Sequence, residues 1–444
     1  MGILSSLRKF DQQPQRFSLN TGTQFDLATG SFAPGKDGHM ILNGGLSMIN
    51  GVAGRPQTFK TSIGLGYFTK TVKNYANSEG ICYDTEMSIP GVPRLINLSG
   101  QVADPDLESR LQLYDKVDLG MEEMFSMTRE IAHEKETHKA DYIRETPFVD
   151  AEGKPQRAWV PTIIAIDSWS AMSSSKEAET YNKFDVGDTK TNMSHMADGR
   201  MKSDFMRQIP SLACSKGIYF VMTAHIGDKA NLDPYAPVLR EVPAMNNKDK
   251  LKNVGSQFLF LTTNLLQTRK ASVLQDDKKK CLYPTEYSSD VELQEVSSIV
   301  CRCKNNVSGA QVDHISSQFY GIQEYLEYYQ LIKDCKSELL TGTIKQKLAI
   351  TEHEFTRHTI RKLIVEDPTF RRALEILGQF VYIRNRWNLP EVKGMGYVEF
   401  AKKFTASKDR ANDMLNSNGI WSYTDVKRDK PYLSIIDIIG MINK

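Results

Sequence analysis

The most constraining feature of the sequence is a glycine-opened loop between an apolar run and a helix-like segment. Residues 54–61 read Gly-Arg-Pro-Gln-Thr-Phe-Lys-Thr, and they follow the apolar side chains of Met48, Ile49 and Val52. After the loop, apolar side chains recur at helical spacing, at Ile63, Tyr67, Phe68, Val72 and Tyr75. The pattern predicts a buried strand, a tight loop and a helix, in this order, over residues 48–75.

This order of elements suits the binding of a polyphosphate. Backbone N–H groups of such a loop point inward, and the positive end of the helix dipole adds to their field. Lys60 would supply a charge to the β- and γ-phosphates, and Thr61 a hydroxyl ligand for Mg²⁺. Phe59 stands where the usual pattern, G-x-x-x-x-G-K-S/T, has its second glycine. An ordinary strand-turn-helix is the alternative. The predicted nucleotide-binding residues are Gly54, Arg55, Pro56, Gln57, Thr58, Phe59, Lys60, Thr61 and Ser62.

Composition bounds the class of protein. The chain has 444 residues, with 56 basic and 54 acidic side chains, which allows one large core and a smaller second domain. The near-balance of charge does not by itself indicate nucleic acid. No apolar run approaches a membrane span, and residues 1–25 lack a signal-peptide core, so a cytoplasmic protein is expected. The six scattered cysteines are expected to be reduced thiols.

Two further apolar runs end in carboxylates. Residues 80–84 lead into Asp84-Thr-Glu86, and a carboxylate at the end of a strand beside a phosphate loop can orient an attacking water. A surface helix cap is the alternative for this pair. Residues 160–168 are an apolar run of the kind buried on both faces, and they deliver Asp167 to the place where Mg²⁺ would be held, directly or through water.

A third run, residues 216–225, ends at His225, which could hydrogen-bond a γ-phosphate and report its presence. Residues 226–253 follow as a long loop with five basic and four acidic side chains. Loops of this length inside a core are usually functional or disordered, and a solvated run of charge is the alternative. The basic side chains of this loop are Lys229, Arg240, Lys248, Lys250 and Lys252.

The rest of the chain divides into shorter elements. Strands are expected at residues 111–114, 258–263 and 298–303, helices at 120–134, 200–212 and 322–335, an irregular surface insertion at 133–160, an aperiodic polar stretch at 173–199 and a hairpin tip at 276–280. From residue 337 the pattern is helical, with Trp387 and Trp421 as expected core anchors. The expected divisions are an N-terminal segment (1–40) that packs on a neighbouring protomer or on the core, a nucleotide-binding core (41–336) and a mainly helical domain (337–444).

The order of these parts resembles the RecA-type recombinases, and within them the phage recombinases of the UvsX type, over roughly residues 40–335. UvsX-like chains similarly have Phe-Lys in the phosphate loop. Residues 83–86 (Tyr-Asp-Thr-Glu) are similar to a Tyr-Asp-Ser-Glu motif of that family. Residues 166–168 (Ile-Asp-Ser) and 175–179 (Ser-Lys-Glu-Ala-Glu) look like its metal-supporting strand and the acidic segment behind it.

The resemblance implies an α/β RecA-type P-loop NTPase core with a mainly parallel sheet. Glu86 would be the catalytic glutamate, His225 the γ-phosphate sensor, and Lys304 a residue that reaches the ATP of the neighbouring protomer. Asn306 departs from the family, which has a second basic residue there. The implied catalytic residues are thus Glu86, Lys60, His225 and Lys304, and the metal residues are Thr61 and Asp167. The implied DNA-binding residues are Arg200, Arg207, Lys229, Arg240, Lys248, Lys250 and Lys252.

The expected function is that of a DNA-dependent ATPase that uses ATP and Mg²⁺. It would assemble as a homo-oligomeric filament on single-stranded DNA and promote pairing and strand exchange with homologous duplex DNA. Such activity would serve phage recombination, repair and replication in the cytoplasm of the host cell, without a membrane.

Two other functions compete with this expectation. A replicative ring helicase of the DnaB class shares the core, and residues 85–88 (Thr-Glu-Met-Ser) are similar to its Leu-Glu-Met-Ser run. Residues 1–47 are shorter than the N-terminal domain of such helicases, which argues against this class. A scaffold that binds nucleotide without hydrolysis would be expected to lack Glu86 or Lys60, and both are present.

Overall fold

A parallel sheet with an apolar core on each face explains the apolar runs of the sequence. Alternate side chains of β8 (Thr162–Asp167), such as Ile163 and Ile164, belong to opposite cores, and every residue of the strand is buried. β3 (Ile49–Gly54) is likewise buried throughout. Strands covered on both faces need continuous apolar sequence, because successive side chains point to opposite faces.

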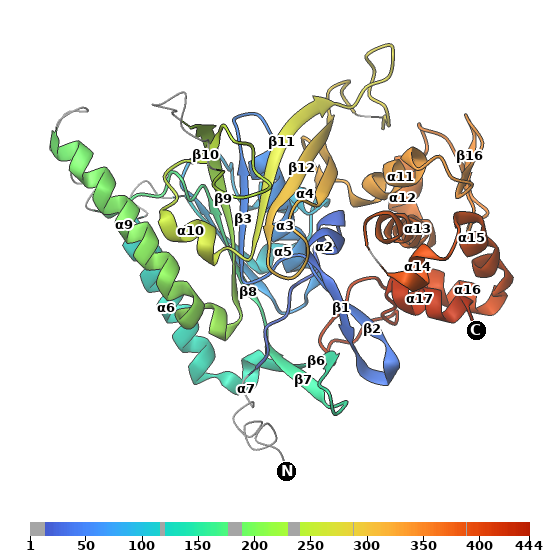
Figure 1. The fold of residues 1–444 in the computed structure, drawn as a ribbon, viewed down its shortest axis with the longest axis horizontal. Helices are drawn as coiled ribbons and strands as arrows, with labels where there is room; N and C mark the ends of the chain where they lie inside the picture. The colour runs from blue at the N-terminus through green and yellow to red at the C-terminus, as the bar shows by residue number, and fades with distance from the viewer. Residues whose placement is uncertain (1–13, 116–119, 176–188, 230–239, 287, 388) are drawn as a thin grey trace.

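The computed structural model describes residues 14–115, 120–175, 189–229, 240–286, 288–387 and 389–444. Within them, a ten-stranded sheet has the order β14-β13-β12-β11-β3-β9-β8-β4-β5, and β10 pairs with β9 (Figure 1). Pairs from β11 through β5 are parallel, whereas β10, β12, β13 and β14 pair antiparallel. The predicted α/β class with a mostly parallel sheet is confirmed. The other strands of this sheet are β4 (Glu79–Asp84), β5 (Leu111–Tyr114), β9 (Ile218–Asp228), β10 (Asp249–Leu251), β11 (Asn264–Val273), β12 (Leu293–Cys303), β13 (Gln311–Ser317) and β14 (Gly321–Ile322).

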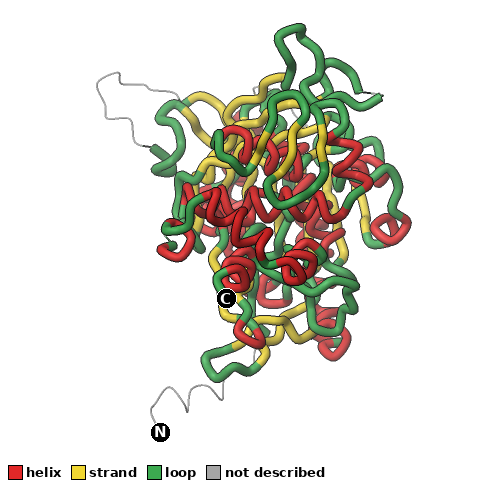
Figure 2. Tube along the Cα trace, turned by 90° about the vertical axis from the view of Figure 1, so that its right-hand side faces the viewer, coloured by secondary structure: helices red, strands yellow, loops and turns green. Residues whose placement is uncertain are grey.

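Helices cover both faces of the sheet, and Figure 1 shows α6 and α9 together along one flank. In Figure 2 the C-terminal helices lie in front of the sheet. The helices of the first face include α3 (Lys60–Asn74), α4 (Val92–Leu98), α5 (Pro105–Ser109), α11 (Glu324–Asp334) and α13 (Pro368–Arg386). Those of the second face are α6 (Met121–Thr137), α9 (Thr189–Leu212) and α10 (Ser256–Leu261).

Both ends of the described chain join the core that contains α3. Phe17 stacks on Phe148, and Trp421 packs edge-on against Phe17 and Tyr75. Trp421 is a core anchor as predicted, whereas Trp387 is only partly buried. The predicted contact of residues 1–40 with a neighbouring protomer stays a prediction. The N-terminal elements are α2 (Gln24–Thr29), β1 (Ser31–Pro34), η2 (Lys36–Gly38) and β2 (Met40–Asn43).

The region after residue 336 is mainly helical, as predicted, with one small antiparallel sheet of β15, β16 and β17. Its apolar side chains continue the core of α3 and α11 rather than forming a separate cluster. Its elements are β15 (Leu340–Thr341), β16 (Gln346–Leu348), β17 (Glu354–Phe355), α12 (Ile360–Glu366), α14 (Pro390–Lys393), α15 (Tyr397–Ala406), α16 (Lys408–Leu415) and α17 (Ile435–Ile442), together with α13.

Three sequence predictions are wrong. The run at 258–263 is mostly the helix α10, and the next strand of the sheet begins only at Asn264, because short apolar runs do not distinguish helix from strand. The supposed insertion at 133–160 contains the end of α6, α7 (Lys139–Tyr142) and an antiparallel pair, β6 (Ile143–Val149) and β7 (Pro155–Trp159). The supposed loop at 226–253 begins inside β9 and contains β10, although residues 230–239 lie outside the described residues.

The other predicted elements match wholly or in part. The strand at 111–114 is confirmed, and the turn at 276–280 closes the β11–β12 hairpin region, where Asp276 N donates to the Lys280 carbonyl at 2.8 Å. The helix predicted at 200–212 is the C-terminal half of α9, which begins at Thr189, within the stretch predicted to lack periodicity. The short 3-10 turn η3 (Cys214–Lys216) then leads into β9.

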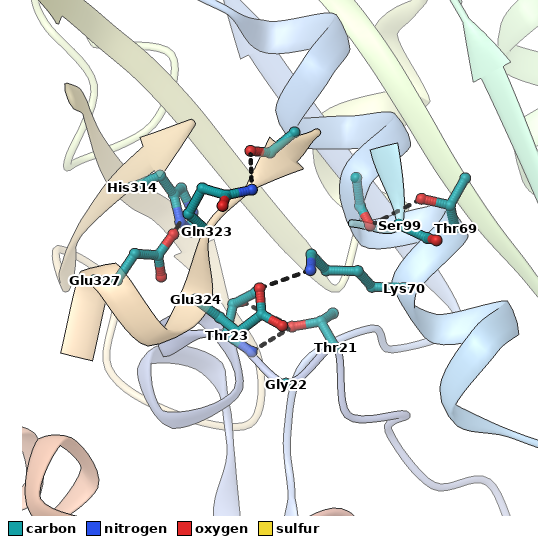
Figure 3. Close-up of polar contacts among 12 residues, drawn as sticks. Thr21, Gly22, Thr23, Thr69, Lys70, Ser99, His314, Gln323, Glu324 and Glu327 are labelled. Atoms are coloured by element: carbon teal, nitrogen blue, oxygen red, sulfur yellow. Dashed lines mark hydrogen bonds and ion pairs between the residues drawn. The ribbon is translucent and has the colours of Figure 1, made fainter. Parts of the chain in front are cut away.

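Polar pairs fix how α3 packs on α11 (Figure 3). Lys70 Nζ lies 2.7 Å from Glu324 Oε2, and His314 Nδ1 lies 2.7 Å from Glu327 Oε1. The other nitrogen of His314 lies 2.5 Å from Tyr67 Oη, on α3. His314, Glu327 and Tyr67 are fully buried, and buried polar groups are costly unless they are hydrogen-bonded. These pairs therefore set one orientation of the helix that follows the loop.

Candidate functional site

The loop joins β3 to α3 as predicted: Gly54 ends the strand and Lys60 begins the helix. Thr58 Oγ1 donates to the Arg55 carbonyl at 2.8 Å and lies 2.7 Å from Thr268 Oγ1 on β11. A Cβ on Gly54 would collide with the hydroxyl groups of Thr58 and Thr268. The glycine that opens the loop is therefore required by the close approach of β11.

Phe59 keeps the backbone shape that the usual glycine would have. It is the N-cap of α3 and adopts a left-handed conformation, with φ of 60° and ψ of 20°. This conformation costs a residue with a Cβ about 1 kcal/mol. The ring packs against the core of α3 and is partly buried, which offsets the cost. The departure from the usual pattern thus places a phenylalanine in a backbone conformation that favours glycine.

Lys60 and Thr61 stand at the N-terminal end of α3. The side chain of Lys60 is 9% exposed, and none of the described residues offers its ammonium group a hydrogen bond or an ion pair. Thr61 Oγ1 donates to Asp167 Oδ1 at 3.2 Å. An ammonium group on a mostly buried lysine, without a hydrogen-bond partner among the described residues and beside the free N–H groups of a helix start, suits a phosphate ligand.

Asp167 is fully buried at the end of β8. Its Oδ1 accepts hydrogen bonds from Thr61 and from Thr223 on β9, whereas its Oδ2 has no partner among the described residues. Burial raises the pKa of Asp167, although the hydrogen bond from Thr223 acts to lower it. A buried carboxylate oxygen without a donor is costly, so a cation or its water fits here.

The residues present fit Mg²⁺ rather than a metal held by protein alone. Within the described part of the chain, no three His, Cys, Asp or Glu side chains come together as a metal site. Mg²⁺ is commonly held by one or two carboxylates together with phosphate oxygens and water. Thr61 and Asp167 would hold the ion with a bound polyphosphate, where it would neutralise charge on the β- and γ-phosphates.

Glu86 forms the other side of the site. Its Oε1 accepts hydrogen bonds from Ser168 Oγ at 2.7 Å and from His225 Nε2 at 2.8 Å. Partial burial acts to raise the pKa of Glu86, but these two hydrogen bonds and the charge of Lys60 outweigh it and leave the pKa below its ordinary value. Glu86 is therefore ionised at neutral pH and can accept a hydrogen bond from water.

Asp84 has a supporting role, and it is not the surface helix cap considered as an alternative, because it is buried and is followed by a turn. Its Oδ1 accepts from Glu86 N at 3.2 Å, and its Oδ2 accepts from Ile89 N at 2.6 Å. Thr85 and Ser168 are joined by two hydrogen bonds between side chain and backbone. The turn after β4 is thus fixed to the end of β8, and Glu86 is held at the edge of the sheet.

Strand register brings these groups together. Gly54 pairs with His225, and Asp84 pairs with Asp167, so the ends of four adjacent parallel strands meet at one edge. The sequence predicts this gathering, whereas the hydroxyl groups of Thr223 and Ser168 were not among the predicted site residues. Their only signal was their position at the ends of predicted strands. The arrangement can cradle a polyphosphate, hold a cation and orient a water molecule.

The predicted basic loop lies next to this edge. Lys248, Lys250 and Lys252 are exposed, whereas Asp249 and Leu251 between them are buried. This alternation places Lys250 of β10, and Lys248 and Lys252 directly before and after the strand, on its outer face, which we call the outer face of β10. Lys252 N donates to the His225 carbonyl at 2.9 Å, and Lys229 N donates to the Lys248 carbonyl at 2.8 Å.

A cavity of about 490 Å³ adjoins β10 and the loop, lined by residues that include Arg55, Arg240, Lys248, Asp249 and Arg269. Arg240 was predicted as a basic side chain of this region, whereas Arg269 was missed. Arg269 directly follows Thr268, which pairs with Gly54, and the wrong placement of that strand hid this position.

The remaining predicted residues make other contacts. Arg200 and Arg207 are exposed on α9, and each approaches Asp204, at 3.9 and 3.2 Å. Lys304 follows β12 at the opposite end of the sheet, and its Nζ donates to the Phe260 carbonyl at 3.2 Å. Within one chain, Lys304 is not brought to the phosphate loop, so the predicted role on a neighbouring protomer's nucleotide stays a prediction.

No protein-family model matches this chain, and no curated protein matches its sequence. Among the described residues, every helix is too short or too polar to span a membrane.

The left-handed turn at Phe59 gives a stability prediction. Phe59→Ala removes the ring but keeps the Cβ, whereas Phe59→Gly removes both. We expect the glycine variant to be the more stable of the two by about 1 kcal/mol, the reverse of the usual order at a helix. Urea unfolding at 25 °C would measure the difference. An alanine variant at least as stable as the glycine variant would contradict the left-handed turn.

Proposed function

We propose that this protein is a DNA-dependent ATPase and recombinase of the RecA type. It binds ATP and Mg²⁺ at the carboxyl edge of the parallel strands and assembles as a homo-oligomer on single-stranded DNA. The assembly then pairs this strand with homologous duplex DNA and exchanges strands. The setting would be phage recombination, repair and replication in the cytoplasm of a host cell.

The observation that carries the proposal is the position of His225. Its imidazole contacts Glu86, which faces the phosphate loop, and its carbonyl accepts a hydrogen bond from Lys252 N, at the end of a strand that presents three lysines. One residue thus touches both the group suited to activate water and the surface suited to phosphodiesters. A protein that only binds nucleotide has no need of this connection.

In hydrolysis, some groups bind the ground state of the nucleotide and another acts on the attacking water. Lys60 and the N–H groups of the loop bind the β- and γ-phosphates, and Mg²⁺, when bound, neutralises their charge. Glu86, ionised and anchored by Ser168, accepts a hydrogen bond from the water that attacks the γ-phosphorus. The bond then breaks between the γ-phosphorus and the oxygen that joins it to the β-phosphorus. ADP, phosphate and a proton from the water are released. Charge stabilisation and positioning supply most of the rate in such reactions.

DNA binding rests on local patches because the chain has a formal net charge of only +2. The exposed face of β10 is the strongest candidate, since Lys248, Lys250 and Lys252 are exposed there, and the only carboxyl whose pKa the charges of Lys248 and Lys252 are seen to lower, among the described residues, is that of exposed Asp228. Lysines that contact phosphates bind all sequences alike and make affinity dependent on salt. This face lies beside His225, so the γ-phosphate can influence its position.

A first test separates binding from turnover. Lys60→Ala should abolish nucleotide binding, because the ammonium group contacts ground-state phosphates. Glu86→Gln should bind nucleotide as the parent does and lose at least about 100-fold in turnover on single-stranded DNA, because the carboxylate acts only on the attacking water. Glu79→Gln, at the opposite end of β4, is the control. Near-parental turnover by Glu86→Gln would remove Glu86 from catalysis.

A second test addresses β10. Replacing Lys248, Lys250 and Lys252 together by alanine should weaken single-strand binding and lower the slope of log affinity against log salt by about 2. The control replaces three exposed lysines of the C-terminal helices, Lys362, Lys402 and Lys408, and should leave the slope unchanged. Equal slopes for the β10 variant and the parent would exclude this face from the DNA site.

A third test concerns assembly. Electron microscopy of the protein with single-stranded DNA and a slowly hydrolysed ATP analogue should show an open helical filament. A closed six-membered ring would instead favour the helicase class, and single particles without DNA would favour a nucleotide-binding scaffold.

A further inference from the structure

Arg55, the second residue of the phosphate loop, holds both strands of the β9–β10 ribbon. Its Nη2 lies 2.7 Å from Asp228 Oδ1, at the end of β9, and 2.7 Å from Asp249 Oδ1, at the start of β10. A basic residue in a phosphate loop would be expected to face the phosphates. Here two carboxylates hold it instead, so its charge is committed to the ribbon.

The two ion pairs differ in burial. Asp228 is 80% exposed, whereas Asp249 is 5% exposed. Exposed ion pairs contribute little, while a buried carboxylate depends strongly on its partners. Asp249 Oδ2 also accepts from Gln267 Nε2 at 2.6 Å, on β11, and from Asn246 Nδ2 at 3.3 Å. We call the two ion pairs of Arg55 the fork. The ion pair with Asp249 is its fixed end, and the ion pair with Asp228 is the weaker of the two.

β10 is attached to the site at both of its ends. At one end, Asp249 forms an ion pair with Arg55 of the phosphate loop. At the other end, the backbone N–H of Lys252 donates to the His225 carbonyl, and the backbone N–H of His225 donates to Ser170 Oγ at 2.9 Å. The hydroxyl of Ser170 donates in turn to the Lys252 carbonyl at 2.8 Å. A three-residue strand has few hydrogen bonds of its own, so these two attachments determine where its lysines point.

The space beside the fork is open. The cavity of about 490 Å³ is lined by Arg55 and Asp249 and by three further basic side chains, those of Arg240, Lys248 and Arg269. Close packing therefore does not lock Arg55 from this side, and the ion pair itself must hold the loop and β10 together.

We propose that Arg55 is a positioning residue that couples occupancy of the phosphate loop to β10, through the buried carboxylate of Asp249. The inference rests on the proposed function, and it adds a second route to the one through His225. Phosphate bound by the N–H groups of the loop fixes the loop backbone. The fixed loop holds Arg55, and Arg55 holds Asp249, so β10 becomes ordered with Lys248, Lys250 and Lys252 outward. By linkage, DNA bound to β10 strengthens nucleotide binding by the same factor.

The test measures a coupling factor, the ratio of oligothymidylate dissociation constants without and with a slowly hydrolysed ATP analogue at saturation. The parent should show a factor of about 10 or more. Asp249→Asn, which removes the buried charge, should lower the factor to below about one third of the parental value, because only the route through His225 is left. Asp228→Asn makes the same change at the exposed end of the fork and should keep the parental factor.

Hydrogen exchange gives a readout that needs no DNA. The analogue alone should slow exchange of the amides of residues 249–252 in the parent and in Asp228→Asn, and by a clearly smaller factor in Asp249→Asn, where only the route through His225 is left. Should Asp249→Asn fail to fold, Arg55→Met serves instead, because methionine keeps an unbranched side chain but removes the charge that holds Asp249, and its factor should fall below one third of the parental value. Coupling at the parental value in whichever of these two variants folds would overturn the inference.

A failure of the proposed function gives a different result. If the parent binds no ATP analogue, measured by fluorescence of a labelled nucleotide, the proposed function fails and the inference fails with it. If the parent binds nucleotide and DNA with a coupling factor that Asp249→Asn preserves, the function stands and the Arg55 route is overturned.

Discussion

The parallel pairing of four strands is the constraint on which the site depends. In a parallel sheet the carboxyl ends of neighbouring strands meet at one edge, so the pairing of Gly54 with His225 and of Asp84 with Asp167 collects groups from distant parts of the sequence. The hydrogen bond from Thr223 to Asp167 then joins β9 to β8 at this edge. A shift of one residue in any pair would turn these side chains to the wrong face.

Two carboxylates of this edge have opposite environments. Asp167 is buried, and its pKa is raised because burial outweighs its hydrogen bonds. Glu86 is partly exposed, and its pKa is lowered because donors and a nearby ammonium group outweigh burial. The first arrangement leaves a buried oxygen in need of a cation, whereas the second yields an ionised group open to water. Environments that separate two acids in this way assign them different roles.

The sequence predicted the site groups that lie at the ends of strands buried on both faces. In an α/β protein, a continuous apolar run that ends in a polar residue indicates a buried parallel strand with the polar residue at the edge of the sheet. It failed where that signal is ambiguous. The run beginning at Phe258 is equally apolar, yet only Phe258 of its first three residues is fully buried, as suits a helix with one inward face. That error displaced the next strand, and Arg269 was lost with it. The alternation along β10 was missed because a three-residue strand is too short for periodicity to appear.

Strand direction also limits what one chain can do. β12 runs antiparallel to β11, so Cys303 pairs with Asn264, while Thr268, four residues further along β11, pairs with Gly54. Four strand steps separate these two ends by about 13 Å, and the side chain of Lys304 is directed to the Phe260 carbonyl. A lysine at this end can act on a nucleotide only if that nucleotide belongs to a second copy. Catalysis that used Lys304 would therefore require assembly, whereas the proposed routes through Arg55 and His225 need only the contacts within one chain.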